Sequence, residues 1–180
     1  MEDLVTFTEL DARGAFVIDL DPRRDDRGFF ARAFCQREFG NLGLATTVAQ
    51  ANIGHSRLRG TLRGLHYQTP PFAEAKLVRC TRGSVYDVMI DLRPGSPTFM
   101  RWVGFELSAA GHRMLYVPEG FAHGHQALED ESEVFYLVSQ PFAPEHERGV
   151  RWNDPAFGIG WPIADPILSP KDRAFPDFER

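Results

Sequence analysis

The stretch of residues 84–92 reads Ser-Val-Tyr-Asp-Val-Met-Ile-Asp-Leu and decides the fold class. Every second residue from Tyr86 to Leu92 is apolar or aromatic, whereas the residues between them include Asp87 and Asp91. This period of two is typical of a β-strand, whose successive side chains point to opposite faces. The apolar face predicts burial, and the carboxylates predict that the second face meets water or a lined cavity.

Short apolar runs like this one follow one another along the chain, which contains 16 Gly and 13 Pro. Turn-forming groups such as Pro94-Gly95-Ser96-Pro97 separate many of these runs. Many short strands divided by turns are typical of an all-β sandwich or barrel, and the double-sheet jelly roll is the predicted architecture. The predicted strands are Val5–Leu10, Ala15–Asp19, Gly28–Phe34, Thr46–Ile53, Thr61–Tyr67, Lys76–Cys80, Ser84–Leu92, Trp102–Leu107, Arg113–Val117, His123–Leu128 and Glu133–Ser139.

Two short helices are predicted. The first covers Cys35–Asn41, and the second covers Ser169–Arg173, with Ser169 as the N-cap and Pro170 at the first helical position. After about Val150 the chain becomes rich in Pro and Trp, which indicates an ordered segment packed on the domain.

Length and composition limit the class of protein. The 180 residues fit one domain, residues 1–180, and the 43% hydrophobic content excludes disorder for most of the chain. A net charge of −5 argues against nucleic acid as the main partner. Cys35 and Cys80 are too few for a disulfide scaffold or a four-cysteine zinc site. Because no signal peptide or membrane span is recognisable, we expect a cytoplasmic protein without a membrane partner.

Two segments concentrate the chemistry-bearing side chains. The first is Arg59-Gly60-Thr61-Leu62-Arg63-Gly64-Leu65-His66-Tyr67-Gln68, and the second is Pro118-Glu119-Gly120-Phe121-Ala122-His123-Gly124-His125. The spacing of the two segments resembles the two motifs of the cupin superfamily of small jelly-roll barrels. In metal cupins the first motif carries two histidines and a glutamate, and the second carries one histidine.

A metal site is one alternative that this resemblance raises. The second histidine of the first motif is missing here, although His66, His123 and Glu74 would still supply three ligands for an open site. Lys76 would place a cation beside that metal, which is unfavourable. We therefore expect no metal and no cofactor.

A closer resemblance covers about residues 7 to 172. The chain resembles the dTDP-4-dehydrorhamnose 3,5-epimerase family, metal-free cupins that epimerise nucleotide-linked 4-keto sugars. The resemblance implies a double-stranded β-helix (the cupin jelly roll) and a dTDP-4-keto-6-deoxy sugar as substrate. The blocks that carry it are Asp26-Arg27-Gly28-Phe29-Phe30, Gln50-Ala51-Asn52, Leu62–Gln68, Lys76-Leu77-Val78, Asp91-Leu92-Arg93, Ser96-Pro97-Thr98-Phe99, Pro118–Gly124, Glu147, Trp152-Asn153-Asp154-Pro155 and Leu168-Ser169-Pro170-Lys171-Asp172.

The catalytic roles follow from this resemblance. Epimerisation beside a ketone needs a base, a group that stabilises the enolate oxyanion, and an acid on the opposite face. The resemblance implies that His66 is the base and that Asp172 is the carboxylate paired with it. It implies that Tyr136 is the proton donor and that Lys76 lies near the sugar ketone. Without the resemblance, each of these residues has an ordinary structural interpretation.

The resemblance also implies the substrate contacts. Arg27, Arg63, Gln50 and Asn52 occupy the nucleotide-binding positions, and arginine suits bidentate contact with phosphate. Strict alternation would put Arg63 and His66 on opposite strand faces, unless Gly64 forms a bulge or Arg63 faces another part of the site. His125 has no role that can be transferred and is expected to be structural. The remaining implied contacts are His123, Phe142, Glu147 and Lys171.

Two positions depart from the family pattern. Arg32 stands where the family usually has a glutamate that contacts the substrate, which leaves the nucleobase preference open. Phe142 stands where a tyrosine usually stacks on thymine, and phenylalanine can still stack.

Three functions are weighed. The first is a 3,5-epimerase of dTDP-4-dehydro-6-deoxyglucose, with a 3-mono-epimerase of a dTDP-4-keto sugar as its variant. The second is a metal-dependent cupin, and the third is a sugar-nucleotide binding protein without catalysis. The resemblance also implies a homodimer in which an N-terminal strand, here residues 26–30, reaches the neighbouring subunit's site.

Overall fold

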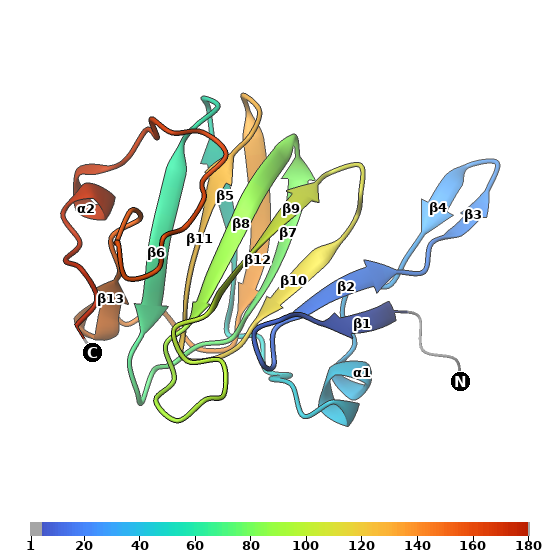
Figure 1. The fold of residues 1–180 in the computed structure, drawn as a ribbon. Helices are drawn as coiled ribbons and strands as arrows, with labels where there is room; N and C mark the ends of the chain where they lie inside the picture. The colour runs from blue at the N-terminus through green and yellow to red at the C-terminus, as the bar shows by residue number, and fades with distance from the viewer. Residues whose placement is uncertain (1–4, 180) are drawn as a thin grey trace.

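Two antiparallel β-sheets face each other in the computed structural model, which describes residues 5–179 (Figure 1). The six-stranded sheet has the order β1 (Val5–Glu9), β2 (Phe16–Leu20), β10 (Met114–Val117), β7 (Lys76–Arg82), β12 (Ser132–Val138), β5 (Gln50–Ser56). The five-stranded sheet has the order β13 (Glu147–Gly149), β6 (Leu62–Gln68), β11 (Phe121–Ala127), β8 (Ser84–Asp91), β9 (Trp102–Ser108). The predicted all-β fold is confirmed.

Strand β8 is buried on both faces, and each face packs against a different part of the molecule. Val85 and Met89 pack in the core between the sheets, beside Leu115 of β10. Val88 and Ile90 point to the outside of the five-stranded sheet, where the segment after Val150 covers them. The apolar face therefore lies against the C-terminal segment, and the face that carries the carboxylates points into the interior.

The C-terminal segment is fixed by hydrogen bonds as well as by apolar contact. The indole of Trp102 donates to the carbonyl of Phe157 at 2.9 Å, and that of Trp161 donates to the carbonyl of Trp152 at 2.8 Å. The segment crosses the outer face of β6 and β11, forms α2 (Pro170–Arg173) and then continues to its last described residue (Figure 1). The predicted N-cap is confirmed, because the Ser169 hydroxyl accepts from the backbone N–H of Asp172 at 3.0 Å.

The other helix, α1 (Gln36–Asn41), packs below β1 and β2 through Phe39, which is buried (Figure 1). A 3₁₀ turn covers Pro144–His146. No helix of the described residues is long and apolar enough to cross a bilayer.

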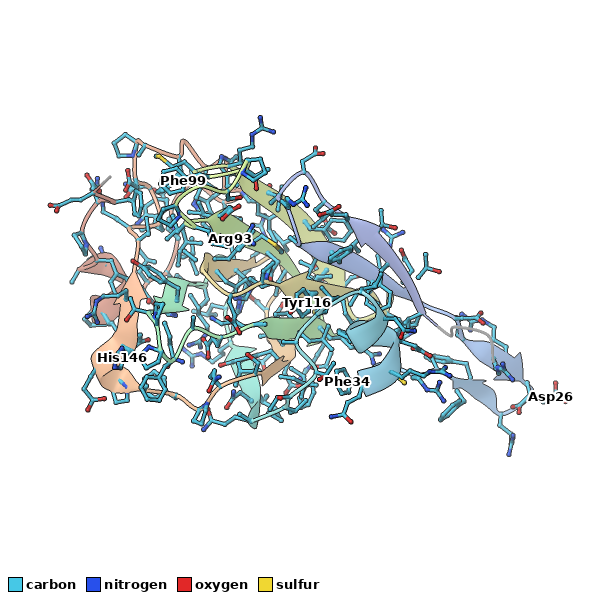
Figure 2. The ribbon with its side chains drawn as sticks, turned by 90° about the horizontal axis from the view of Figure 1, so that it is seen from below. Asp26, Phe34, Arg93, Phe99, Tyr116 and His146 are labelled. Atoms are coloured by element: carbon cyan, nitrogen blue, oxygen red, sulfur yellow. The ribbon has the colours of Figure 1, made fainter. Side chains whose placement is uncertain are left out.

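A small hairpin, β3 (Arg23–Asp25) and β4 (Gly28–Phe30), projects from the body of the molecule (Figure 1). Asp26 lies at its outer tip, at the opposite end of the molecule from His146 (Figure 2). Phe29 and Phe30 remain exposed in it. The prediction of one strand over Gly28–Phe34 is wrong, because the chain leaves the hairpin after Phe30 and no partner strand continues the ladder.

Candidate active site

A cleft opens between the sheets at the end of β6 and β12. It consists of two adjoining cavities of about 380 and 370 Å³, and both cavities are lined by His66, Lys76 and Tyr136. His66 belongs to the five-stranded sheet, whereas Lys76 and Tyr136 belong to the six-stranded sheet. The imidazole therefore faces the phenol and the ammonium from the opposite wall of the cleft.

His66 is paired with a carboxylate from α2. Its Nε2 lies 2.6 Å from Oδ1 of Asp172, a residue 106 positions later in the chain. The other oxygen, Oδ2, accepts the Ser169 hydroxyl at 2.8 Å. The pair occupies Nε2, which leaves Nδ1 of His66 without a partner among residues 5–179 and free to accept a proton.

Asp172 is held in its charged form. Burial raises the pKa of this carboxyl, but hydrogen bonds from His66 and Ser169 and the nearby imidazole charge outweigh burial, so the pKa lies below its usual value. A carboxylate that stays ionised at neutral pH fixes the ring orientation of His66 and can stabilise the imidazolium that forms when Nδ1 accepts a proton.

Phe175 holds the other side of the His66 ring, at a centroid distance of 5.4 Å in an edge-on arrangement. Phe175 lies on Gly149 of β13, where a Cβ atom would come within 2.4 Å of the phenyl ring. The sequence alone gave no signal for this residue, because its contacts lie on distant strands.

Lys76 has a carboxylate partner on the same wall. Its Nζ lies 3.2 Å from Oε1 of Glu74, and the Gln68 amide donates to the other oxygen of Glu74 at 3.3 Å. Only about a tenth of each of the two charged side chains is exposed. The ammonium therefore lies in a site where water screens its charge poorly.

Tyr136 is suited to donate a proton. Burial raises the pKa of the phenol, and the charge of Glu74 raises it further, against an opposing effect of Arg63. The hydroxyl is therefore protonated at neutral pH, and it faces the cleft that also contains His66.

A second histidine–carboxylate pair lies beside the first. His123 of β11 is the cross-strand neighbour of His66, and its Nε2 lies 2.9 Å from Oδ1 of Asp87. Asp87 is completely buried. Sequence analysis did not assign Asp87 a role, although the alternation of β8 had already placed its carboxylate on the lined face.

Of the two alternatives left open for Arg63 and His66, the structure shows the bulge at Gly64. The register between β6 and β11 shifts between the pairs His123–His66 and His125–Arg63. Gly64 has φ of +123°, and a Cβ atom there would lie 2.5 Å from the Cα of Gly124, so both strands need glycine at this point. As a result Arg63 and His66 line the same cavity.

The structure also gathers most of the predicted substrate contacts around the cleft. Gln50 of β5 accepts a hydrogen bond from the backbone N–H of Phe142 at 2.9 Å, and the phenyl ring is 55% exposed. The Lys171 ammonium lies 2.6 Å from Oε2 of Glu147. The first cavity is lined by Gln50, Asn52, Phe142 and Glu147, and the second by Arg63, His123 and Lys171.

Arg27 is the one predicted contact that the structure leaves outside the cleft of its own chain. It lies on the projecting hairpin, its side chain is 89% exposed, and its guanidinium pairs with Asp25 at 2.6 Å.

Comparison with known proteins gives the family. The family model for dTDP-4-dehydrorhamnose 3,5-epimerase matches residues 9–180. The chain belongs to this family. The dTDP-4-dehydrorhamnose 3,5-epimerase of Pseudomonas aeruginosa is 50% identical over 171 residues, which cover 91% of this chain and 93% of that one.

Solved structures of the dTDP-4-dehydrorhamnose 3,5-epimerase family share the fold. The enzyme from Bacillus anthracis, solved with TDP and PPi bound, superposes with a TM-score of 0.91 at 41% identity and covers 97% of this chain and 99% of its own. ChmJ, a 3'-monoepimerase from Streptomyces bikiniensis solved with dTDP-quinovose, gives 0.85 at 35% identity, with coverage of 93% and 85%. The predicted cupin jelly roll is confirmed.

In this member of the dTDP-4-dehydrorhamnose 3,5-epimerase family, the three ligands of the metal alternative do not converge. His66 is paired with Asp172, His123 with Asp87, and Glu74 with Lys76. Within the described range 5–179, no group of three or more His, Cys, Asp and Glu side chains has an arrangement that could hold a metal.

Proposed function

We propose that this chain is an isomerase that inverts C3 and C5 of dTDP-4-dehydro-6-deoxyglucose by proton transfer through an enolate. The observation that carries the proposal is the placement of a histidine–carboxylate pair and a protonated tyrosine on opposite walls of one cleft. Epimerisation requires that a proton leave one face of the carbon and return to the other, and this arrangement supplies both faces.

His66 removes the proton. Both C3 and C5 lie beside the C4 ketone, so loss of a proton from either carbon gives an enolate with its charge on the C4 oxygen. Nδ1 of His66 accepts the proton, and Asp172 stabilises the resulting imidazolium.

Lys76 and Tyr136 complete each inversion. The Lys76 ammonium stabilises the enolate oxygen, and its charge is poorly screened because little of the side chain is exposed to water. Tyr136 then gives its proton to the opposite face of the carbon. Before the next inversion the His66 imidazolium releases its proton to solvent and the phenolate recovers a proton from solvent. The same three groups act on C3 and on C5 in turn.

The nucleotide is held at the cleft mouth. Arg63, Gln50 and Asn52 bind the diphosphate, and the exposed ring of Phe142 stacks on the base. His123, Glu147 and Lys171 complete the contacts from the two cavities.

Arg27 acts on the neighbouring subunit in this proposal. The hairpin carries Arg27 away from its own cleft and presents Phe29 and Phe30 to solvent. We propose a homodimer in which residues 26–30 cover the partner's cleft and add a cation to its diphosphate site.

Proton NMR of dTDP-4-dehydro-6-deoxyglucose in deuterated water tests the function. Exchange at both C3 and C5 with the wild-type chain, and its loss in His66→Asn, is the expected result. His55→Asn is a matched control, because His55 pairs with Glu131 on the surface, outside the cleft. A pure folded wild-type protein that exchanges neither proton would overturn the proposal.

A second candidate is epimerisation at C3 alone. The chain is 35% identical to a 3'-monoepimerase, which supports this second candidate function. The same NMR experiment separates the two, since a mono-epimerase leaves the C5 proton in place.

A further inference from the structure

His125 of β11 carries a buried imidazole that opens into the second cavity of the cleft. Only 7% of the residue is exposed. Neither ring nitrogen makes a hydrogen bond to any residue between Val5 and Glu179. The ring nitrogens are not closed off from the cavity, so a ligand bound there can form hydrogen bonds with them.

The surroundings keep this imidazole neutral. Burial and, to a smaller extent, electrostatic interactions with His123, Arg63 and His66 together lower the pKa of His125 to about 3, against an opposing effect of Asp172. A neutral imidazole carries one N–H donor and one acceptor nitrogen, which is the complement of a hydroxyl group. It has no charge with which to hold the diphosphate.

The position of His125 in the cleft indicates which hydroxyl group of the proposed substrate it contacts. Arg63, its direct cross-strand partner, lies at the diphosphate on C1, and His66 acts at C3 and C5. Lys76 is assigned to the oxygen on C4, and C6 is a methyl group. Of the ring oxygens that remain, only the hydroxyls at C2 and C3 can both donate and accept a hydrogen bond. The C2 hydroxyl is the one next to C1, and His125 is paired directly with Arg63, whereas His66 is paired with His123.

We propose that His125 binds the C2 hydroxyl of the hexose and makes the enzyme selective for 4-keto sugars that carry an oxygen at C2. This inference rests on the proposed function and extends it to a residue that sequence analysis took to be structural. His125 is a specificity residue in this scheme and takes no part in the proton transfers.

Kinetic discrimination tests the inference. The kcat/KM of dTDP-4-keto-6-deoxyglucose is compared with that of its 2-deoxy analogue, dTDP-4-keto-2,6-dideoxyglucose, for the wild type and for His125→Phe. The wild type should prefer the 2-hydroxy sugar by about tenfold, since the analogue leaves the imidazole unpaired. His125→Phe should bring the ratio close to one. Because both substrates meet the same preparation, the ratio does not depend on how much of the protein is folded.

Two more variants distinguish the loss of hydrogen bonding from the change in side-chain shape. His125→Gln retains a donor and an acceptor and should keep most of the preference, whereas His125→Leu should lose it as His125→Phe does. Titration calorimetry with the unreactive dTDP-6-deoxyglucose and its 2-deoxy analogue should give the same order of affinities without any turnover.

The outcomes separate this inference from the proposed function. A wild type that is active on the 2-hydroxy sugar, with the same substrate ratio in His125→Phe and His125→Leu, overturns the role of His125 alone. A wild type that exchanges no proton of the 2-hydroxy sugar overturns both proposals.

Discussion

Asp172 is the single residue on which the proposed base depends. Its Oδ1 lies 2.6 Å from Nε2 of His66 and keeps Nδ1 as the free nitrogen. In Asp172→Asn the neutral amide cannot stabilise the imidazolium, and we expect kcat to fall by about 10²- to 10⁴-fold with little change in KM. Steady-state kinetics measures this.

Ser169→Ala is the matched control for Asp172→Asn. It removes one hydrogen bond to the carboxylate, at 2.8 Å, and leaves the charge in place. Its effect on kcat should be much smaller. Equal losses in the two variants would mean that Asp172 acts only by positioning α2.

His125 should make stability depend on pH. Its pKa is about 3 in the folded chain, whereas an unfolded histidine has a pKa of about 6.5. The unfolded state therefore binds more protons between these values, and stability falls as pH drops from about 6.5 toward 3. The lowered pKa of Asp172 acts in the same direction, but only below the ordinary range of a carboxyl.

His125→Phe should remove this contribution, about 2 kcal/mol of the stability difference between pH 7.5 and pH 5. Urea denaturation at the two pH values, at equal protein concentration, measures it. An unchanged difference would show that the imidazole is hydrated in the folded protein.

The residues predicted from sequence and those missed differ in a physical way. The resemblance supplied His66, Asp172, Tyr136 and Lys76, and the structure brings all four to one cleft. The alternation of β11 put His125 on the same face as His123, but alternation does not tell whether that face meets packed core or an open cavity. The distance between this face and the opposite sheet decides whether a cavity forms, and that distance cannot be predicted from the local sequence.

At the scale of elements, Arg32 links the chain after the hairpin to α1. Its Nη1 lies 3.2 Å from Oε1 of Glu38, whose side chain is 1% exposed. The other oxygen of Glu38 has no hydrogen-bond partner among the described residues. This ion pair gives Arg32 a contact within its own chain, at a position where the family that the sequence resembles usually has a glutamate that contacts the substrate.

Arg32→Glu should destabilise the protein by about 1 to 3 kcal/mol, because it places a second carboxylate beside a buried one. Thermal unfolding measures the loss. Arg32→Gln keeps a donor and should lose less. If Arg32→Gln instead unfolded like the wild type but bound dTDP more weakly, Arg32 would be a nucleotide contact.

Strand predictions held where alternation was strong and failed where it was weak. β8 was predicted to within one residue, since its apolar face has a fixed period. The short strands β3 and β13 were missed. Their three-residue sequences, Arg-Arg-Asp and Glu-Arg-Gly, carry no apolar face, and their pairing comes from a turn in one case and from β6 in the other.

At the scale of the whole molecule, a mixing experiment tests the proposed exchange of the hairpin. Arg27→Ala and His66→Ala should each be nearly inactive alone. In a mixed dimer, the subunit with intact His66 receives the intact Arg27 of its partner, so one site in each mixed dimer is complete. After unfolding and refolding together at equal amounts, activity should return to about a quarter of the wild type.

A mixture that stays inactive would mean that Arg27 serves the cleft of its own chain. An Arg27→Ala variant that is active on its own would mean that Arg27 serves neither cleft. Light scattering on the same samples gives the oligomeric state, and a monomer would contradict the proposal directly. The sequence of one chain does not predict which cleft Arg27 serves, and in the described part of the chain the hairpin supplies no residue to the lining of its own cleft.

The two walls of the cleft come from different sheets, and this has a consequence for how the family can diversify. In the proposed mechanism, the base and its carboxylate lie on β6 and α2, whereas the lysine that stabilises the enolate lies on β7 and the proton donor lies on β12. A substitution in the second group can change which carbon is inverted, or whether inversion follows exchange at all, while the base and its carboxylate stay as they are. We therefore expect that changes on the six-stranded sheet can alter the stereochemistry of the product while the residues proposed to remove the proton stay unchanged.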